Sequence, residues 1–230
     1  MKLIGNGRKT PRWQPEKSAV LHCWCFAVIA CGALIAGLAT AAENTAERPS
    51  TWAQPVLVED VPNLHKLSDT LYRSAQPTAE GMQNLKKMGV KTIVNLRSYH
   101  SDREEIGETG LAYEHIYMKP WHPERKEIVR FLRIVTDPER TPVLFHCQHG
   151  ADRTGTMCAI YRVAVQGWST EEALREMREG GFGFHEVWAN LPEWIEDLDI
   201  ESIKKDAGID GGAESAPQAE KANEEPAKQR

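Results

Sequence analysis

Residues 142–166 restrict most strongly what this chain can fold into. The apolar run PVLFHC ends in Cys147, a loop containing two glycines follows, and residues 154–166 are apolar on most sides. A short apolar run followed by turn residues is typical of a buried strand, and the longer apolar stretch is typical of a central helix. This strand–loop–helix unit predicts an α/β fold with residues 147–155 at the carboxyl end of a strand.

The remaining central sequence alternates in the same way between short apolar runs and amphipathic stretches. Strands are predicted at residues 70–74, 90–97 and 112–118, and helices at 78–88, 127–136, 170–179 and about 187–204. This alternation favours a central, mostly parallel sheet flanked by helices on both faces. Ligands of such sheets bind beyond the carboxyl ends of the strands, where the loop after Cys147 would lie.

The amino-terminal segment has the composition of an export signal. Residues 1–17 are basic, residues 18–42 contain no Asp, Glu, Lys or Arg, and the stretch ends in Ala39-Thr40-Ala41. A basic segment, an apolar stretch and small residues describe a signal peptide. Residues 19–42 also reach the ~20 apolar residues that span a bilayer. We therefore expect residues 1–42 to be a signal peptide or membrane anchor, with the remainder exported, periplasmic or membrane-anchored outside the cytoplasm.

The other boundaries follow from composition. Residues 43–51 are predicted to be a linker. Residues 206–230 contain almost only Ala, Glu, Lys, Pro, Gln and Gly, with too little apolar surface to order themselves, and are predicted to be a disordered tail. Residues 52–205 remain, which is the size of one domain.

Cysteine usage and charge exclude several classes of protein. Of five cysteines, only Cys147 and Cys158 lie outside the amino-terminal segment, too few for a disulfide scaffold. The sequence contains no CxxC or HExxH spacing, so neither a metal site nor a cofactor is expected. The net charge is −5 and no basic surface interleaved with aromatic residues is evident, which disfavours nucleic acid. Cys158, Trp168, Trp188 and Trp194 are expected to serve packing.

The loop after the strand has the residues of a phosphate site. Backbone amides of a tight loop that leads into a helix bind oxyanions, and the helix dipole adds to this. The same field favours the thiolate of Cys147. Arg153 can hold two phosphate oxygens with its planar guanidinium. The chemistry predicted is in-line attack of Cys147 on phosphorus, which gives a phosphocysteine. The expected phosphate-binding residues are Gln148, His149, Gly150, Ala151, Asp152 and Arg153, with His146 and Thr154 supporting the thiolate.

The pattern His-Cys-x2-Gly-x2-Arg-Thr-Gly after an apolar strand resembles the signature of the cysteine-dependent protein tyrosine and dual-specificity phosphatase superfamily. Upstream, LYRSAQPTAEGMQNLKKMGVKTIVNLR resembles the amino-terminal half of its exported bacterial dual-specificity branch. Together the resemblance covers residues 67–168. It implies a dual-specificity-phosphatase-like fold and hydrolysis of phosphoric monoesters without a metal, with Cys147 and Arg153 as catalytic residues.

The sequence departs from this family at the general acid. The family usually supplies an Asp from a mobile loop between the third strand and the helix before the signature. Here that loop reads MKPWHPERKE, with no Asp from residue 112 to 136. Asp152 is the first candidate, because it belongs to the loop that binds the phosphate. The other candidates are His122, Glu124 and Asp102.

Several functions remain open at this stage. The expected substrate is phosphotyrosine, phosphoserine or phosphothreonine in a protein, or a small phosphomonoester. An inositol phosphate or lipid headgroup is the alternative with the same chemistry. A catalytically weak phosphate-binding module and a rhodanese-like sulfur transferase are further alternatives. Arg73 and Gln76 are expected either to line the pocket or to make structural hydrogen bonds. The sequence does not predict the oligomeric state.

Overall fold

The computed structural model describes residues 48–209. The predicted signal peptide or anchor at residues 1–42 and most of the predicted tail lie outside this range. Among residues 48–209, no helix combines the length and the apolar character that crossing a membrane requires. The fold described below is therefore that of the central domain alone.

The central domain contains a six-stranded sheet with the strand order β1-β2-β3-β6-β4-β5. Strands β3, β6, β4 and β5 run parallel, and β1 and β2 add an antiparallel edge. The prediction of a mostly parallel sheet is confirmed. The elements in chain order are β1 (Gln54–Pro55), β2 (His65–Ser68), β3 (Leu71–Ser74), α1 (Ala79–Lys87), β4 (Thr92–Asn95), α2 (Arg103–Ile106), β5 (Ala112–His115), α3 (Arg125–Val135), β6 (Val143–His146), α4 (Asp152–Ala164), α5 (Thr170–Glu179), the 3-10 helix η1 (Glu186–Trp188), α6 (Asn190–Glu196) and α7 (Ile200–Ala207).

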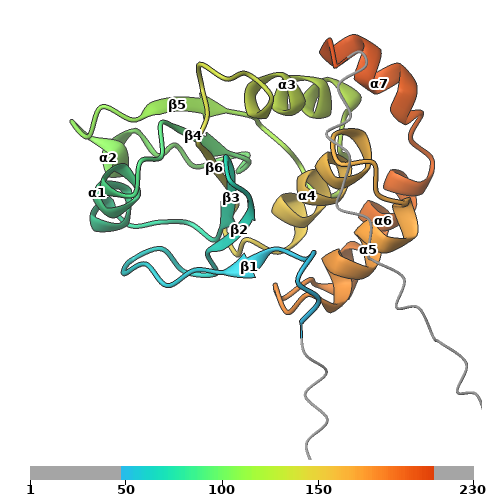
Figure 1. The fold of residues 1–230 in the computed structure, drawn as a ribbon, viewed down its shortest axis with the longest axis horizontal. Coiled ribbons are helices and arrows are strands. Elements are labelled where there is room, and N and C mark those ends of the chain that lie inside the picture. The colour runs from blue at the N-terminus through green and yellow to red at the C-terminus, as the bar shows by residue number, and fades with distance from the viewer. Residues whose placement is uncertain (1–47, 210–230) are drawn as a thin grey trace, which may run out of the picture. The chain divides into compact units, whose positions relative to one another are not determined.

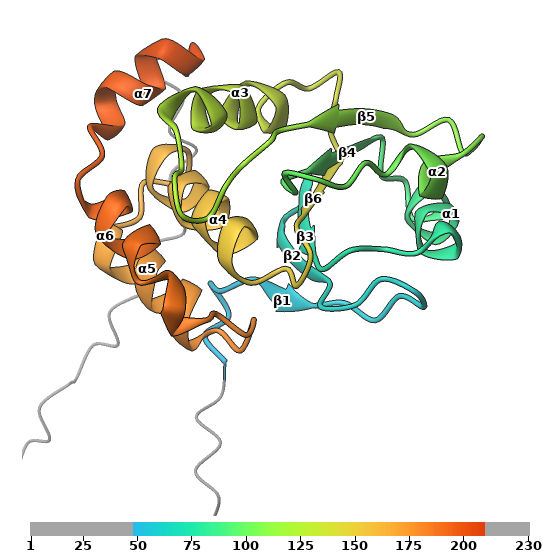
Figure 2. The same cartoon turned by 180° about the vertical axis from the view of Figure 1, so that it is seen from behind.

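Helices cover both faces of the sheet, as the alternation predicted. Successive side chains of a strand point to opposite faces. Leu144 of β6 therefore packs with residues of α1 such as Leu85, whereas its neighbour Phe145 packs with Phe131 of α3 and Ile160 of α4. Figures 1 and 2 show α1 and α2 on one side of the sheet and α3 to α7 on the other. β6 is thus buried from both sides, which explains its unbroken apolar sequence.

The prediction of a single helix over residues 187–204 is wrong. The chain there forms η1, α6 and α7. The side chain of Asp199 accepts a hydrogen bond from the backbone N–H of Ser202 at 3.0 Å, so Asp199 caps the start of a new helix. α7 continues to Ala207, two residues past the predicted domain end at Lys205. Asp206 belongs to the fold, because it forms an ion pair with Arg125 of α3 at 2.6 Å.

Two elements near the site were not predicted. β2 joins the sheet beside β3, and α2 is a single turn after β4. Both are only four residues long, too short for a periodic pattern to stand out. α2 matters for function because Asp102, the residue before it, is fully buried at the end of the sheet.

Candidate active site

Three parallel strands end side by side where the predicted loop begins. In the strand register His146 of β6 lies opposite Ser74 of β3 on one side and Asn95 of β4 on the other. Cys147 follows directly and is only 2% exposed. The nucleophile predicted from the sequence therefore lies at the carboxyl edge of the sheet, between β6 and the start of α4.

The phosphate loop, residues 147–153, packs closely against the end of β3. Gly150 has φ +70°, and a Cβ there would lie 2.6 Å from backbone atoms of Ser74 and Ala75. The fully buried Arg73 donates a hydrogen bond from Nη2 to the carbonyl of Gly150 at 2.6 Å. Its guanidinium also stacks over the ring of Phe182 at 3.7 Å. Of the two roles open for Arg73, the structure shows the structural one: it supports the loop from behind.

Hydrogen bonds to the outer side of the loop orient its amides. The carbonyl of Gln148 accepts from the N–H of Gln76 at 3.3 Å, and that of His149 accepts from the side chain of Asn63 at 2.9 Å. In a trans peptide the N–H points opposite to the preceding carbonyl. The N–H groups of the residues that follow Gln148, His149 and Gly150 therefore point to the inner side of the loop. Such a set of amides can bind a phosphate.

Arg153 and Gln148 line a pocket of about 320 Å³. Arg153 makes only long contacts there, 3.4 Å to the carbonyl of Leu96 and 3.5 Å to that of Met118. Its guanidinium is thus available to a ligand. The other lining residues are Arg97, Ser98, Tyr99, Pro120, Trp121 and Trp188. Trp188, which the sequence assigned to packing, therefore also forms part of the pocket wall.

A buried ion pair holds the histidine that precedes the nucleophile. Nε2 of His146 lies 2.7 Å from Asp102 Oδ2, and Nδ1 lies 3.2 Å from the carbonyl of Cys147. Both ring nitrogens thus face oxygen acceptors, which fixes the orientation of the ring. Burial disfavours the Asp102 carboxylate, but hydrogen bonds from His146 and Gln76 and the charge of His146 outweigh this and lower the pKa of that carboxyl. Asp102 also accepts from Asn95 at 2.9 Å.

Thr154, which was expected to support the thiolate, makes no hydrogen bond to the cysteine sulfur in this structure. Thr154 Oγ1 is buried and has no hydrogen-bond partner. Thr154 lies in the first turn of α4, which begins two residues earlier than the helix predicted at residues 154–166. The hydroxyl is a polar atom still free to bond a thiolate or a phosphate oxygen.

None of the four candidate acids lines the pocket. Asp102 is fully buried against His146. Glu124 caps α3 and forms an ion pair with Lys126 at 2.6 Å. His122 lies on the exposed loop between β5 and α3, where its backbone N–H bonds the carbonyl of Lys119 at 3.0 Å.

Asp152 is bound to His185, a residue that the sequence reasoning missed. Asp152 Oδ1 accepts from the backbone N–H of His185 at 2.9 Å, and both carboxylate oxygens lie 3.0 Å from Nδ1 of that ring. The glycine-rich run GGFGFH, which ends in His185, was the signal available in the sequence, since it marks a loop that can fold back over a neighbour.

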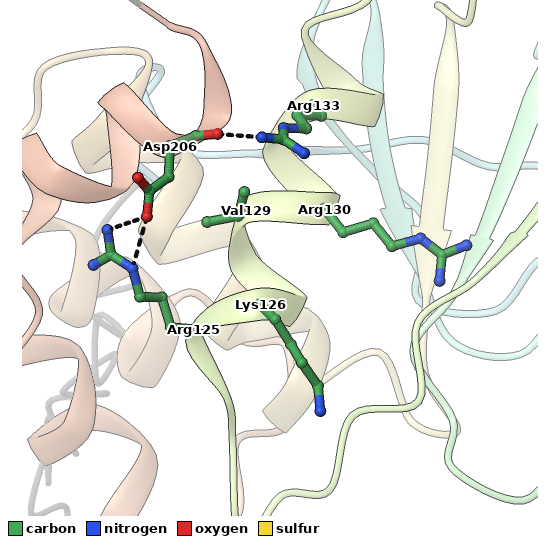
Figure 3. A pocket seen from close by; sticks show the side chains of 6 residues that line it. All are labelled: Arg125, Lys126, Val129, Arg130, Arg133 and Asp206. Atoms are coloured by element: carbon green, nitrogen blue, oxygen red, sulfur yellow. Dashed lines mark hydrogen bonds and ion pairs between the residues drawn. The ribbon is translucent and has the colours of Figure 1, made fainter.

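A second hollow, of about 540 Å³, lies between α3 and α7 and has a basic lining (Figure 3). Arg125 and Arg133 both bond Asp206 there, and Arg130 turns away to pair with Glu114. The hollow contains no nucleophile, and its arginines hold α7 in place. The smaller pocket, lined by Gln148 and Arg153 of the phosphate loop, is therefore the candidate active site.

A comparison with models of protein families identifies the family of this chain. A model described as "DSP-PTPase phosphatase fused to NAD+ Kinase" matches residues 54–189, which include the whole sheet and the phosphate loop. This chain is a cysteine-dependent dual-specificity and tyrosine phosphatase. The family resemblance seen in the sequence is confirmed, and with it the class of enzyme and its phosphomonoester chemistry.

Individual relatives of this phosphatase agree with the assignment. It is 37% identical over 175 residues to the dual specificity protein phosphatase TpbA of Pseudomonas aeruginosa strain UCBPP-PA14, covering 74% of this chain and 78% of TpbA. A crystal structure of TpbA matches with a TM-score of 0.63 at 34% identity, covering 70% of this chain and 99% of that chain. The catalytic core of the PP-IP phosphatase SIW14 from S. cerevisiae, in complex with citrate, matches with a TM-score of 0.57 at 26% identity, covering 66% and 95%.

Proposed function

We propose that this phosphatase acts on phosphotyrosine, and that the phosphate loop and the aromatic side chains around it bind different parts of the substrate. The loop binds the phosphoryl group, which every substrate of this chemistry shares. The pocket wall binds the group that carries it. The observation that carries the proposal is that Tyr99, Trp121 and Trp188 line the same pocket as Arg153.

The first step transfers the phosphoryl group to sulfur. The Cys147 thiolate attacks phosphorus in line, the S–P bond forms, and the bond from phosphorus to the ester oxygen breaks. Arg153 and the loop amides stabilise the charge on the equatorial oxygens. The leaving oxygen takes a proton from a general acid and departs as an alcohol or phenol. Water then attacks the phosphocysteine and releases inorganic phosphate and the thiolate.

Two residues are proposed as the acid that protonates the leaving oxygen, Asp152 and His122. Asp152 is next to Arg153 in the loop, but its carboxylate is bonded to His185. His122 is exposed on the loop that also carries the pocket residues Pro120 and Trp121. Proton transfer from Asp152 requires its bonds to His185 to open. Transfer from His122 requires its loop to close over the substrate.

An aromatic substrate fits the pocket wall. The rings of Trp121 and Trp188 lie 6.4 Å apart and tilted by 32°, and Tyr99 is 85% exposed. Aromatic rings in offset or edge contact are worth about 0.5–1.5 kcal/mol beyond their buried area. A crystal structure of a TpbA variant in complex with pTyr, 34% identical to this chain, supports the same assignment.

A second candidate substrate is a polyphosphorylated inositol. Arg97 lines the pocket beside Arg153 and gives it a second guanidinium, although Arg97 also bonds Gln76 at 3.0 Å. Relatives with this activity in their names are SIW14 and the inositol diphosphatase DSP5 of Arabidopsis thaliana, 27% identical over 155 residues. Two guanidiniums favour a ligand with more than one phosphate.

A substrate panel tests these proposals. The full chain should hydrolyse para-nitrophenyl phosphate and a phosphotyrosine peptide in the presence of a chelator, and Cys147→Ser should abolish both activities. A kcat/KM that is higher for an inositol pyrophosphate than for the peptide would assign the second candidate. Turnover of thiosulfate instead of phosphate esters would contradict both.

Trp121→Ala sharpens the choice of substrate. This change should raise KM for the phosphotyrosine peptide several-fold and leave KM for an inositol pyrophosphate unchanged. Tyr117→Ala is the matched control, because Tyr117 is an exposed aromatic residue of the same loop that does not line the pocket. Equal effects of the two variants would contradict an aromatic binding site.

We further propose that the enzyme works outside the cytoplasm, free or anchored by residues 19–42. The support is the basic and uncharged composition of the amino-terminal segment, which lies outside the described residues. A reporter that is active only in an oxidising compartment, fused after the last residue, should be active, and deletion of residues 18–42 should silence it. Activity that survives the deletion would contradict the proposal.

A further inference from the structure

Two histidines and a carboxylate meet beside the phosphate loop. His149, Asp152 and His185 each offer one ligand atom, and these atoms all lie within 4.8 Å of one another. Nδ1 of His185 is 3.0 Å from both oxygens of Asp152. The rings of His149 and His185 are 5.3 Å apart and tilted by 55°. The three residues come from two separate segments, so no sequence motif identifies the cluster.

The backbone of this cluster is fixed while its histidine rings are open to solvent. Asn63 donates one hydrogen bond to the carbonyl of His149 and one to that of Phe182, at 2.9 and 3.0 Å, and so ties the two segments together. The Asp152 side chain is 9% exposed and is held by the backbone N–H of His185. Both histidines are exposed. A dissolved cation can therefore reach a set of donors that is largely arranged in advance.

We propose that His149, Asp152 and His185 bind one divalent transition metal ion, best matched by Zn²⁺, and that the bound ion lowers phosphatase activity. Zn²⁺ takes imidazole nitrogen and carboxylate oxygen at about 2.0–2.2 Å, and two ligands of one tetrahedral ion lie roughly 3.3 Å apart. The Asp152–His185 separation is already close to this value. A turn of the exposed His149 ring completes a three-ligand site whose fourth position is left to water.

Binding replaces a proton by a metal. The ion takes the place of the hydrogen bond between His185 and Asp152: a proton on Nδ1 of His185 passes to water, the nitrogen lone pair binds the ion, and one Asp152 oxygen becomes the second ligand. The metal then joins two residues of the phosphate loop to the segment that ends in His185. Asp152 is thereby withdrawn from proton transfer. The inhibition rests on the proposed function, whereas the binding does not.

A second cluster, formed by His100, Asp102 and Glu105, also has its ligand atoms within 4.8 Å of one another but is a poorer site. The Asp102 carboxylate already accepts hydrogen bonds from His146, Gln76 and Asn95. A metal there would compete for the oxygens that hold His146 beside the nucleophile. His100 is therefore the matched control for the site proposed.

A metal titration tests the proposal directly. The full chain, made without a polyhistidine tag and freed of metal with a chelator, is titrated with Zn²⁺ by calorimetry and with Co²⁺ by visible absorption. One ion should bind, with the absorption of a tetrahedral nitrogen and oxygen site. His149→Asn and His185→Asn should each weaken binding by at least roughly 10²-fold. His100→Asn should leave the affinity unchanged, and so should Cys147→Ser.

Each result bears on the proposal. Loss of binding in Cys147→Ser would show that the thiolate is the ligand, and loss in His100→Asn would show that the second cluster is, so either would overturn it. Parent affinity in both His149→Asn and His185→Asn would also overturn it. Thermal melting in chelator checks that the variants fold. Zn²⁺ should inhibit turnover of para-nitrophenyl phosphate less in His149→Asn than in the parent chain. If the chain hydrolyses no phosphate ester, the proposed function fails, but the binding isotherm still stands.

Discussion

The phosphate loop and the loop between β5 and α3 both carry chemistry, but they are built in opposite ways. In the phosphate loop Cys147, Gly150 and Ala151 are buried, and the fully buried Arg73 holds it from behind. In the loop of residues 116–124, Tyr117 and Trp121 are 62% and 56% exposed. The first loop is fixed by contacts between buried backbone atoms, whereas the second alternates buried side chains, such as Ile116 and Met118, with exposed ones.

This difference explains where the sequence departs from its family. A change in the phosphate loop disturbs backbone packing against β3, so the signature is preserved there. A change at an exposed position of residues 116–124, such as His122, alters one side chain and leaves the core untouched. The family's usual Asp is absent from that loop, and its absence leaves the fold unchanged. Variants at the two loops and in the core test this contrast.

Gly150→Ala should abolish activity and destabilise the domain by several kcal/mol. The new methyl group would lie 2.6 Å from the backbone of Ser74 and Ala75, and φ +70° adds about 1–2 kcal/mol of strain. Gly167→Ala is the matched control, since Gly167 has the same φ with no atom within 4 Å of the added Cβ. Urea unfolding should separate the two variants clearly. Equal destabilisation would mean that contact with β3 does not hold the loop.

Loss of the general acid should reduce kcat by about 10² to 10⁴-fold for alkyl phosphates and much less for aryl phosphates with acidic phenols. Asp152→Asn keeps the hydrogen bonds to His185 but cannot donate a carboxylic proton. His122→Ala removes the candidate on the exposed loop. The variant that shows the selective loss identifies the acid. A uniform loss across both substrate classes in Asp152→Asn would mark Asp152 as a residue that shapes the loop.

Arg153→Lys should reduce kcat on every substrate by about 10² to 10³-fold, because lysine cannot offer two parallel donors to the equatorial oxygens. The fold should stay intact, since Arg153 makes only long protein contacts. Arg125→Lys in the second hollow is the control and should leave kcat unchanged (Figure 3). An unchanged kcat in Arg153→Lys would contradict the role of the phosphate loop.

Glu127→Gln should change how stability depends on pH. Burial raises the pKa of the Glu127 carboxyl to about 7 from an ordinary 4.5. Between these values the unfolded chain releases the proton and the folded chain keeps it, so stability falls as pH rises from 4.5 to 7. Glutamine should remove this fall and stabilise the domain at pH 8 by on the order of 1–3 kcal/mol.

Unfolding curves across this pH range measure the effect. Glutamine can still accept the hydrogen bond that Glu127 accepts from the N–H of Glu124 at 2.9 Å, so the capping of α3 is preserved. A matched change at the exposed Glu139 should leave the pH profile as in the parent chain. A slope that persists in Glu127→Gln would assign it to another group.

Local sequence signals were enough to predict the strand–loop–helix unit, with Cys147 directly after the strand and Arg153 at the start of the helix. These signals are an apolar run for β6, glycines for the loop and an apolar stretch for α4. The mostly parallel sheet followed from the alternation of such elements. Two features could not be predicted in this way. β2 has only four residues, too few for a periodic pattern, and the break before α7 depends on the single cap Asp199.

Which distant residues meet the phosphate loop depends on the tertiary structure. Asp102 reaches His146 across 44 residues of sequence, and His185 reaches Asp152 across 33. Such pairs form because of the order of the strands in the sheet and the path of loops that fold back over it. Neither feature produces a periodic pattern in the sequence. From the sequence Asp102 was therefore a candidate acid, whereas in the structure it holds His146 in place. Arg73 supports the loop from behind because β3 happens to lie beside β6, and spacing along a chain carries no such information.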